Sequence, residues 1–398
     1  MTGRYDVIVV GVGGMGSAAC YHLARRGVRV LGIERFTLGH DRGSSHGQTR
    51  VIRRAYFEHP DYVPLLNRAY QLWDELSQEA GEVLFPRTGL LLCGPPGSEL
   101  LEGVRRTAVQ HGLDIAALTG EEAARRFPAF CVPPGHDVLF EADAGYLRVE
   151  ASVRAHAALA ERHGAALWTS CSVRSFSFSG GAARVETDRG TVEAGALVVC
   201  GGAFSAPILK DLALPLTVLR KVLLWYDAPD PRLRRDAGFP VFLASDDQQG
   251  GDFYGFPVLP GVADGEGLKV AEHSGGEPLG SAERSGAPCS DDPLAVDRSL
   301  RPADPERCAA FLRRYVPSMA ASVAAGPRRH DVCLYTMTPD GDFIVDRHPE
   351  QPALCYAAGF SGHGFKFASV MGEALADLAT QGRTDLPIGF LRRDRFSR

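Results

Sequence analysis

The sequence predicts a mixed α/β protein that contains a nucleotide-binding unit with a parallel sheet. The chain of 398 residues is long enough for two or three domains, and its 45% hydrophobic residues can fill a core in each. Its first forty residues indicate a strand, a glycine-rich turn, a helix and a second strand. Two later apolar runs that end in glycine indicate further strands of the same sheet.

The N-terminal segment carries these elements in the order that a dinucleotide site requires. Residues 6–10 form a continuous apolar run rich in β-branched side chains, which favours a strand covered on both faces. The run ends at GVGGMG (residues 11–16), and a helical stretch over residues 18–27 ends in two arginines and a glycine. A second strand over residues 28–33 ends in Glu34. This spacing predicts a dinucleotide-binding turn.

Each glycine of the GxGxxG spacing has a physical role. Gly11 makes the tight turn, Gly13 allows the backbone to reach a pyrophosphate, and Gly16 packs the helix against the strand. Glu34 accepts the ribose hydroxyls and disfavours a ribose phosphate, so NAD or FAD is preferred over NADP. The predicted contacts of this segment are Gly11, Gly13, Gly14, Met15, Gly16, Glu34 and Arg35.

The remaining strands of the nucleotide-binding unit are separated by long inserts. Residues 196–203 and 353–359 are apolar runs ending in glycine, and each indicates a buried strand. A nicotinamide-dependent dehydrogenase would usually continue with strands and helices in one contiguous domain. The unit is therefore predicted to be discontinuous.

Composition excludes several classes of partner and compartment. The net charge of −5 gives no strong positive field for nucleic acid or anionic lipid. The longest apolar runs are far shorter than the roughly 18 to 20 residues of a membrane span. Nine cysteines form no CxxC pair, no secretory signal is visible, and the end Arg395–Arg398 carries no peroxisomal SKL signal, so a cytoplasmic protein without a metal site is expected.

The segment Gly43–Tyr56 resembles the monomeric sarcosine oxidase and N-methyltryptophan oxidase family, and the resemblance extends over nearly the whole chain. Four further segments carry it: Phe253–Pro257, Gly267–Val270 with His273, Val332–Tyr335, and Gly359–Phe367. The resemblance implies a flavoprotein amine oxidase of the D-amino-acid-oxidase-like superfamily. It implies a Rossmann-like FAD-binding domain, discontinuous in sequence, formed by residues 1–85, 150–218 and 325–398. It also implies a substrate domain built on an antiparallel sheet, formed by residues 86–149 and 219–324.

The resemblance also assigns roles in the chemistry. Arg53 and Lys366 form the substrate carboxylate pair, and Arg50 lies against the flavin. Arg50 and Arg53, three residues apart, would project to one side if this stretch were helical or turned. By resemblance Tyr254, His273 and Tyr335 line the amine pocket, Lys269 activates oxygen, and Cys333 links the flavin through a thioether.

Further FAD contacts follow from the resemblance. They are Ser45, His46, Thr49, Val173, Gly201, Gly202, Gly359, Phe360, Gly362, His363, Gly364 and Lys366. A helix over residues 367–380 is expected to direct its N-terminus at the flavin pyrimidine end. The sequence departs from the family at Ser44-Ser45-His46, where two adjacent histidines are common. It also departs at Ser274–Pro302, a long segment rich in Gly, Ser and Pro that is expected to be a surface loop near the pocket mouth.

The resemblance implies the reaction of sarcosine with oxygen and water to give glycine, formaldehyde and hydrogen peroxide. N-methyltryptophan, or a cyclic imino acid such as proline or pipecolate, stays an alternative substrate. An NAD-dependent dehydrogenase and a flavin-binding protein without turnover are the alternatives from other classes. A monomer that uses a small N-methyl amino acid and oxygen, with no nucleic-acid or membrane partner, is expected.

Overall fold

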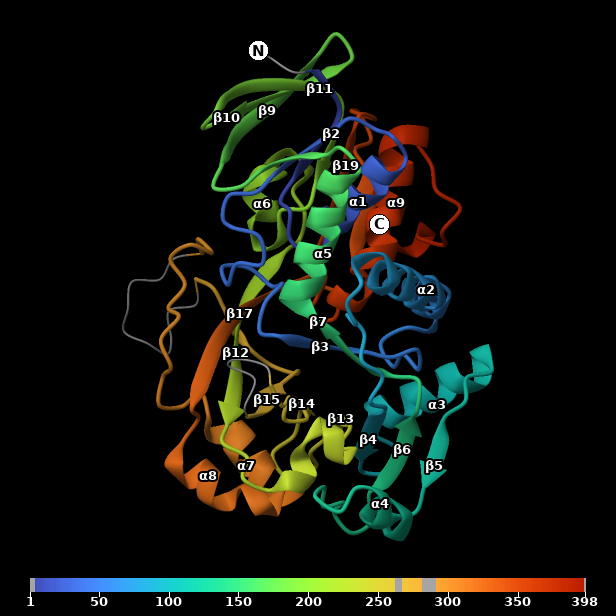
Figure 1. The fold of residues 1–398 in the computed structure, drawn as a ribbon, viewed down its shortest axis with the longest axis vertical. Helices are drawn as coiled ribbons and strands as arrows, with labels where there is room; N and C mark the ends of the chain where they lie inside the picture. Colours follow the sequence, from blue (N-terminus) through green and yellow to red (C-terminus); the bar gives the residue numbers. More distant parts are fainter. Residues whose placement is uncertain (1–3, 262–266, 281–290, 397–398) are drawn as a thin grey trace.

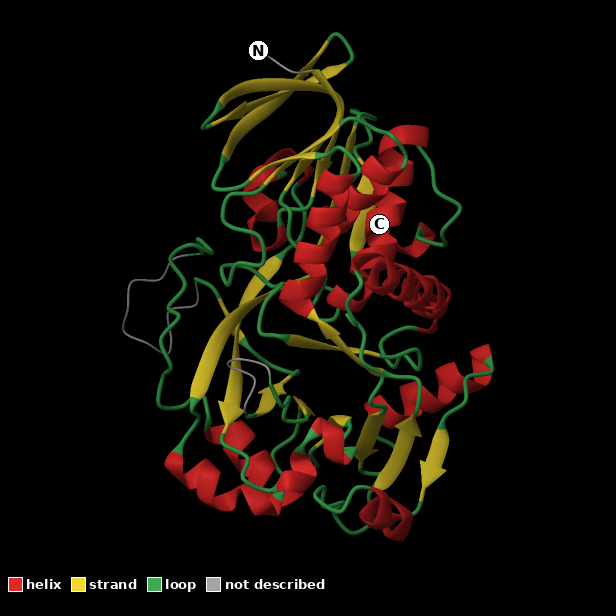
Figure 2. Cartoon of the chain, viewed as in Figure 1, coloured by secondary structure: helices red, strands yellow, loops and turns green. Residues whose placement is uncertain are grey.

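The computed structural model describes residues 4–261, 267–280 and 291–396, and its strands form two large sheets and one small one (Figure 1). An eight-stranded sheet lies in the upper half of the view and a nine-stranded sheet in the lower half. Helices cover the eight-stranded sheet and lie below the nine-stranded one (Figure 2). The mixed α/β class predicted from the sequence is confirmed.

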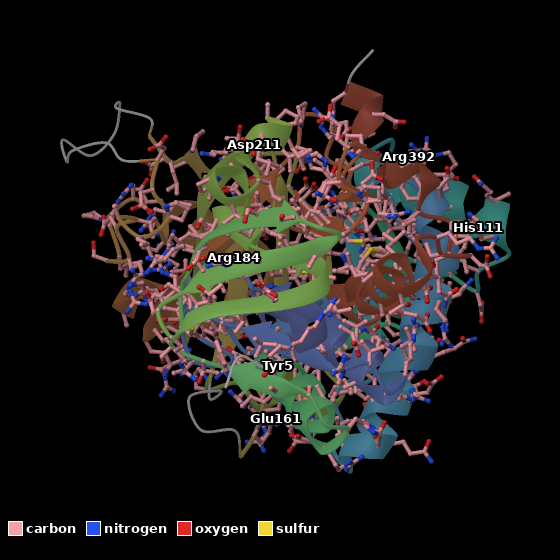
Figure 3. The ribbon with its side chains drawn as sticks, turned by 90° about the horizontal axis from the view of Figure 1, so that it is seen from above. Tyr5, His111, Glu161, Arg184, Asp211 and Arg392 are labelled. Atoms are coloured by element: carbon pink, nitrogen blue, oxygen red, sulfur yellow. The ribbon has the colours of Figure 1, made fainter. Side chains whose placement is uncertain are left out.

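The eight-stranded sheet contains the predicted parallel core. Its strands are β1 (Arg4–Val10), β2 (Val30–Ile33), β8 (Ala166–Trp168), β9 (Val173–Ser179), β10 (Ala182–Thr187), β11 (Gly190–Val199), β18 (Ile344–Arg347) and β19 (Leu354–Ala358). The order β19-β11-β1-β2-β8 is parallel throughout, whereas β18 is antiparallel to β19. The four strands predicted from apolar runs are thus adjacent, although they come from three distant parts of the chain. The strands β9 to β11 form an antiparallel layer that faces the viewer in Figure 3, around Arg184.

Four helices cover one side of this sheet. They are α1 (Gly14–Arg25), α2 (Val63–Ala80), α5 (Val149–Arg162) and α9 (Ala368–Gln381). Helix α1 packs between α5 and α9. The contact with α9 is close, because a Cβ on Gly372 would lie 2.5 Å from atoms of Ala18. In addition, His22 Nε2 lies 3.1 Å from the carbonyl oxygen of Ser369.

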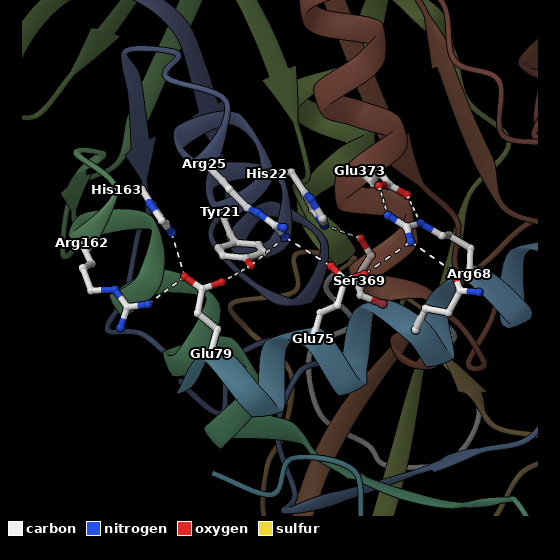
Figure 4. Close-up of polar contacts among 11 residues, drawn as sticks. Tyr21, His22, Arg25, Arg68, Glu75, Glu79, Arg162, His163, Ser369 and Glu373 are labelled. Carbon is white, nitrogen blue, oxygen red and sulfur yellow. Dashed lines mark hydrogen bonds and ion pairs between the residues drawn. The ribbon is translucent and has the colours of Figure 1, made fainter. Parts of the chain in front are cut away.

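Ion pairs on the outer surface join the same four helices (Figure 4). Arg68 of α2 pairs with Glu373 of α9 at 2.6 Å, and Arg25 of α1 pairs with Glu75 of α2 at 3.3 Å. Glu79 accepts hydrogen bonds from Tyr21 and lies against Arg162 and His163 at the end of α5. Exposed pairs of this kind contribute about 0–1 kcal/mol each, so the buried apolar faces provide most of the helix packing energy.

The nine-stranded sheet is antiparallel except at one pair. Its strands are β4 (Leu90–Gly94), β5 (Ala116–Leu118), β6 (Asp137–Glu141), β12 (Thr217–Tyr226), β13 (Val241–Ser245), β14 (Asp252–Phe256), β15 (Leu268–Glu272), β16 (Glu277–Pro278) and β17 (Arg329–Met337). Only β13 and β4 pair in parallel. The helices of this half are α3 (Glu99–His111), α4 (Gly120–Arg126), α7 (Glu306–Tyr315) and α8 (Ala320–Ala325), while the short α6 (Ser205–Ile208) follows β11. Strand β17, from the C-terminal segment, pairs with β12 along nine residues and so belongs to this sheet.

A third, two-stranded sheet lies between the two large ones (Figure 1). It consists of β3 (Thr49–Ile52) and β7 (Gly145–Arg148). Arg50 therefore lies in a strand and Arg53 directly after it, so the helical spacing considered for these two arginines is wrong. Side chains alternate between the two faces of β3, so the position of Arg50 is set by the strand. The position of Arg53 is set by the backbone that follows the strand.

The segment Ser274–Pro302 is expected to be a surface loop, but part of it forms a strand, β16. Strand β16 pairs with β12 inside the sheet. Farther along, the Arg220 guanidinium binds the carbonyl oxygens of Asp297 and Ser299 and the Asp304 carboxylate. Residues 281–290 lie outside the described part of the chain. A buried arginine thus fixes the end of this segment against the sheet.

Two further expectations concern the chain as a whole. In the described residues no helix is long and apolar enough to cross a membrane. The eight cysteines in the described ranges are all free thiols, and Cys289 falls outside those ranges.

Candidate active site

A cavity of about 750 Å³ extends from the carboxyl end of β1 to the inner face of the nine-stranded sheet. One end is lined by Gly11, Gly13 and Gly14, and the other by Tyr254 and Tyr335. Its volume lies within the range of roughly 300–1,000 Å³ that is usual for small-molecule and cofactor sites. The cavity therefore has room for an elongated organic ligand that reaches both sheets.

The end of the cavity at β1 is formed by backbone. Gly11 has a φ of +85°, and a Cβ there would lie 2.4 Å from the carbonyl oxygen of Cys200. A Cβ on Gly16 would lie 1.8 Å from the carbonyl oxygen of Gly11. The N-cap residue of helix α1, Gly13, has no side chain, and the Gly14 amide donates a hydrogen bond to the Ser45 hydroxyl oxygen at 3.1 Å. A helix N-terminus reached by close-packed glycines suits a pyrophosphate.

Glu34 is fixed as a carboxylate beside this turn. Its two oxygens accept hydrogen bonds from the amides of Val12 (2.8 Å) and Phe36 (3.0 Å), and His40 lies 3.3 Å away. Burial acts to raise the pKa of Glu34, but the hydrogen bonds from His40, Phe36 and Val12 bring it below its ordinary value. The charged carboxylate can still accept hydrogen bonds from the hydroxyl groups of a ribose.

Glycines also form the wall of the cavity next to the second sheet. Gly359 and Gly362 have φ values of +62° and +81°, and a Cβ on Gly362 would lie 2.3 Å from the Tyr335 ring. The Thr336 hydroxyl lines the cavity and is buried without a hydrogen-bond partner in the structure. A close glycine wall with an unpartnered hydroxyl fits a flat, polar ring system such as a flavin.

Arg53 and Lys366, the pair that the resemblance assigns to a substrate carboxylate, both line the cavity. Arg53 Nη2 contacts both carboxylate oxygens of Glu58 at 2.8 Å, while its Nε is buried without a partner. Lys366 Nζ donates to the His363 carbonyl oxygen at 2.7 Å and lies 3.4 Å from the Tyr56 hydroxyl. All three charged side chains line the cavity.

The pKa values show how strongly this cluster is coupled. Burial, with the Arg53 charge beside it, lowers the pKa of Lys366 to about 7. Burial alone would raise the pKa of Glu58, but Arg53, His363 and Lys366 bring it down to about 2. Below about pH 7 the site therefore contains two buried cations and one carboxylate, and it retains a net attraction for a second carboxylate.

An aromatic wall faces this charged cluster. His273 lies between Tyr254 and Tyr335, with ring centroids 6.3 and 6.1 Å away. Burial lowers the pKa of His273 to about 3, so its imidazole is neutral near neutral pH. The wall is thus uncharged, which favours the neutral form of an amine beside it.

Cys333 and Arg50 meet on the cavity wall between the two ends. Arg50 Nη2 lies 3.3 Å from Cys333 Sγ and donates to the Ser44 carbonyl oxygen at 3.0 Å. Both residues line the cavity. The guanidinium and the sulfur therefore occupy the same part of the wall.

Lys269 lies just behind this wall. Its ammonium donates to the carbonyl oxygens of Gly47 at 2.5 Å and Thr49 at 2.9 Å. The rings of Phe256 and Trp225 lie 4.8 and 5.2 Å from Nζ. Burial and the neighbouring Arg50 hold the pKa of Lys269 well below its ordinary value.

The cavity brings most of the predicted site residues together. Those that line it are Gly11, Gly13, Gly14, Met15, Glu34, Arg35, Ser45, Arg50, Arg53, Val173, Gly201, Gly202, Tyr254, His273, Cys333, Tyr335, Gly359, Phe360, Gly362, His363, Gly364 and Lys366. Four others, Gly16, His46, Thr49 and Lys269, lie behind the lining. No cluster of metal-ligating side chains occurs in the described residues.

Sequence reasoning missed several lining residues, of which Glu58 matters most. It also missed Phe57 and Leu243, which lie at the substrate end, and Thr336. The signal available for Glu58 was an acid five residues after Arg53, and this spacing alone does not show that the two side chains meet. Phe57 and Leu243 have the pattern of ordinary core residues.

Known proteins resemble this chain over nearly its full length. The profile of the family described as FAD dependent oxidoreductase matches residues 6–378. The monomeric sarcosine oxidase of Streptomyces avermitilis is 39% identical, with 98% of this chain and 97% of the relative covered. The N-methyl-L-tryptophan oxidase of Escherichia coli O139:H28 is 35% identical, with 99% and 100% covered.

Solved structures show the same architecture. NikD, an unusual amino acid oxidase essential for nikkomycin biosynthesis, superposes in its open form with a TM-score of 0.83 at 26% identity, covering 98% of each chain. L-Proline dehydrogenase from P. horikoshii shares the fold with a TM-score of 0.82 at 22% identity, covering 100% of this chain and 99% of that one. The family match favours FAD over the NAD alternative that the first forty residues left open. The chain therefore belongs to the family of FAD-dependent oxidoreductases, among the relatives of the monomeric sarcosine oxidases and N-methyl-L-tryptophan oxidases.

Proposed function

We propose that this protein is an FAD-dependent oxidase of N-methyl amino acids, with sarcosine as its first expected substrate. The observation that carries the proposal is the buried Arg53–Lys366 pair, which faces a neutral aromatic wall inside the cavity. The names of the relatives at 35–39% identity support the same class of substrate.

The charged cluster would hold the substrate carboxylate. Arg53 already binds a carboxylate, that of Glu58, and guanidinium groups bind carboxylates in a forked geometry. A substrate carboxylate would join Glu58 at this arginine, so the site would then hold two carboxylates. Lys366 supplies the second positive charge.

The opposite wall would hold the amine over the flavin. The residues of this wall would hold the amine so that the C–H bond next to its nitrogen faces the flavin, and FAD, when bound, would supply the two-electron oxidation and the transfer of electrons to oxygen. The neutral His273 and the rings of Tyr254 and Tyr335 exclude water and favour the amine with a free lone pair. Lys269 is the proposed oxygen-activating cation, because a positive charge stabilises the charge that develops on oxygen.

We further propose that Cys333 binds the flavin covalently. Its burial, its position on the cavity wall and the Arg50 guanidinium beside its sulfur support this assignment. Acid precipitation of the purified protein should leave yellow colour in the pellet, whereas Cys333→Ser should release it into the supernatant. Yellow colour in the wild-type supernatant would contradict the covalent link.

We propose a division of the chain that the two large sheets support except at β17 (Arg329–Met337), which lies in the nine-stranded sheet although it falls within residues 325–398. Residues 1–85, 150–218 and 325–398 would bind FAD, and residues 86–149 and 219–324 would form the substrate domain. Strand β17 contributes Cys333 and Tyr335 from the C-terminal segment to the second sheet. We also propose a monomer in the cytoplasm, which size-exclusion chromatography and cell fractionation would test.

An anaerobic titration tests the substrate proposal. The purified protein would be mixed with sarcosine, N-methyltryptophan, proline, pipecolate and glycine, while the flavin band at about 450 nm is followed. Bleaching by an N-methyl amino acid is the expected result. Bleaching only by proline or pipecolate would favour the cyclic imino acid alternative, and no bleaching would favour a flavin protein without turnover.

A further inference from the structure

Lys221 is a buried cation to which the proposed reaction assigns no role. It lies on β12 directly opposite Cys333 of β17, and Leu219 lies opposite Tyr335. Because alternate residues of a strand share a face, Lys221 lies on the same face of this pair as Cys333 and Tyr335. It is 5% exposed, so its charge is almost completely removed from water.

The ammonium binds three consecutive backbone carbonyl groups. Its Nζ donates to the oxygens of His273 at 3.2 Å, Ser274 at 2.8 Å and Gly275 at 3.1 Å. An ammonium has three N–H donors, so the set of donors matches the set of acceptors. Charge-assisted hydrogen bonds of this kind are stronger than bonds between neutral groups. Lys221 therefore fixes the backbone that follows His273.

The backbone is shaped to admit this lysine. Gly275 and Gly276 have φ values of +63° and +129°, a region that favours glycine. A Cβ on Gly276 would lie 3.0 Å from Lys221 Cδ. The two glycines thus allow the turn to close around the lysine side chain.

The same cation also contacts the aromatic wall. Lys221 Nζ lies 5.3 Å from the centroid of the Tyr335 ring, within cation–π distance. Tyr335 and His273 line the cavity and face each other at 6.1 Å, whereas Lys221 lies behind them, outside the lining. One buried charge therefore contacts both residues of this part of the substrate wall.

A second cation supports the hairpin of strands β14 and β15, whose last residue directly precedes His273. Arg307 of α7 binds the Glu272 carboxylate at 2.8 Å and the Gly250 carbonyl oxygen at 2.6 Å. It is absent from the cavity wall. Arg307 thus provides a matched control, because it stabilises the hairpin without contact to His273 or Tyr335 in the wall.

We infer that Lys221 is a positioning residue that fixes His273 and Tyr335 and thereby sets the width of the amine pocket. The inference rests on the proposed function above and deepens it. Without Lys221 the His273 turn relaxes and the pocket accepts bulkier side chains. The lysine therefore favours small N-methyl amino acids over large ones.

The test compares Lys221→Met, Lys221→Gln and Arg307→Met in the FAD-loaded enzyme. For Lys221→Met we expect KM for sarcosine to rise about tenfold with kcat nearly unchanged, the pattern of lost binding rather than lost chemistry. The ratio of kcat/KM for N-methyltryptophan to that for sarcosine should also rise about tenfold. Lys221→Gln keeps two N–H donors and should lie between Lys221→Met and the wild type. Arg307→Met should retain the wild-type ratio.

Hydrogen exchange gives a readout that needs no substrate. Amides of residues 273–276 should exchange faster in Lys221→Met than in the wild type, while those of β3 stay unchanged. Wild-type exchange together with a wild-type substrate ratio in Lys221→Met would overturn the inference, and so would an equal change of the ratio in Arg307→Met. If neither substrate reduces the wild-type flavin, the proposed function fails, and the exchange measurement still tests the role of Lys221 in the wall.

Discussion

The two ends of the cavity are built from different materials. The nucleotide end is formed by backbone, with Gly11 and Gly16 packed so closely that no side chain fits. The substrate end is formed by buried charges, namely Arg53, Glu58 and Lys366. Backbone geometry at the first end follows from local spacing, whereas the second end brings Lys366 to the Arg53–Glu58 pair from a distant part of the chain.

The two ends also differ in the free energy that burial of their polar groups costs. The glycine turn presents amides whose charges are partial, so its burial costs less than the burial of full charges. The substrate end removes full charges from water, which the pKa of Lys366 at about 7 reflects. The first end should therefore fail through steric clash, and the second through loss of charge balance.

The largest effect is expected at the nucleotide end. Gly16→Ala would place a Cβ 1.8 Å from the carbonyl oxygen of Gly11 and should abolish FAD binding. Purified protein should be colourless, which an absorption spectrum would show. Gly120→Ala is the control, because no atom lies within 4 Å of its added Cβ. A yellow Gly16→Ala protein with normal flavin content would contradict the backbone account of this end.

At the substrate end, Arg53→Met should lower kcat/KM for sarcosine roughly 10³-fold. Truncation of one member of a buried charge pair costs about 2–5 kcal/mol. Arg54→Met is the matched control, since the Arg54 guanidinium pairs with Asp143 and is absent from the cavity wall. Steady-state kinetics and the flavin content of both variants give the comparison. Equal losses in the two variants would show that Arg53 has no special role in binding.

The same contrast explains what the sequence could predict. The strands and the helix around Gly11–Gly16 lie within a few residues of the bounds that the sequence predicts. Glu58 was missed because its pairing with Arg53 depends on the chain reversal after β3. The sequence around Lys221 gives no sign of its role, because the turn after His273 that binds its ammonium is distant in the chain. Such contacts depend on tertiary structure and leave no local pattern.

Lys269→Met should separate the two halves of the reaction. Removal of one group that stabilises developing charge typically costs about 10²-fold in rate, and here the loss should fall on reoxidation of the reduced flavin by oxygen. Stopped-flow measurements of flavin reduction by sarcosine and of reoxidation by oxygen would give the two rates. A variant slowed only in reduction would contradict the role given to Lys269.

The smallest effect is a pH dependence at the substrate end. The pKa of Lys366 is lowered by burial and by Arg53 to about 7, so the side chain is cationic below this pH and neutral above it. Binding of acetate, a carboxylate without an amine, should weaken up to about tenfold from pH 6 to pH 8. The pKa values of Glu58 (about 2) and His363 (about 4) lie below this window. Acetate affinity would be measured at each pH by titration, with the flavin absorption spectrum as the signal. In Lys366→Met this affinity should not change with pH. The same pH dependence in the variant as in the wild type would place the titrating group elsewhere.

The cavity is proposed to select an amine by its carboxylate. Anaerobic reduction of the flavin by sarcosine, compared with dimethylamine at equal concentration, tests it most directly, because the second compound lacks only that carboxylate among its binding groups. The account predicts rapid bleaching by sarcosine and none by dimethylamine, with the response to sarcosine lost in Arg53→Met. Equal bleaching by both amines, or by sarcosine in the variant as in the wild type, would contradict it.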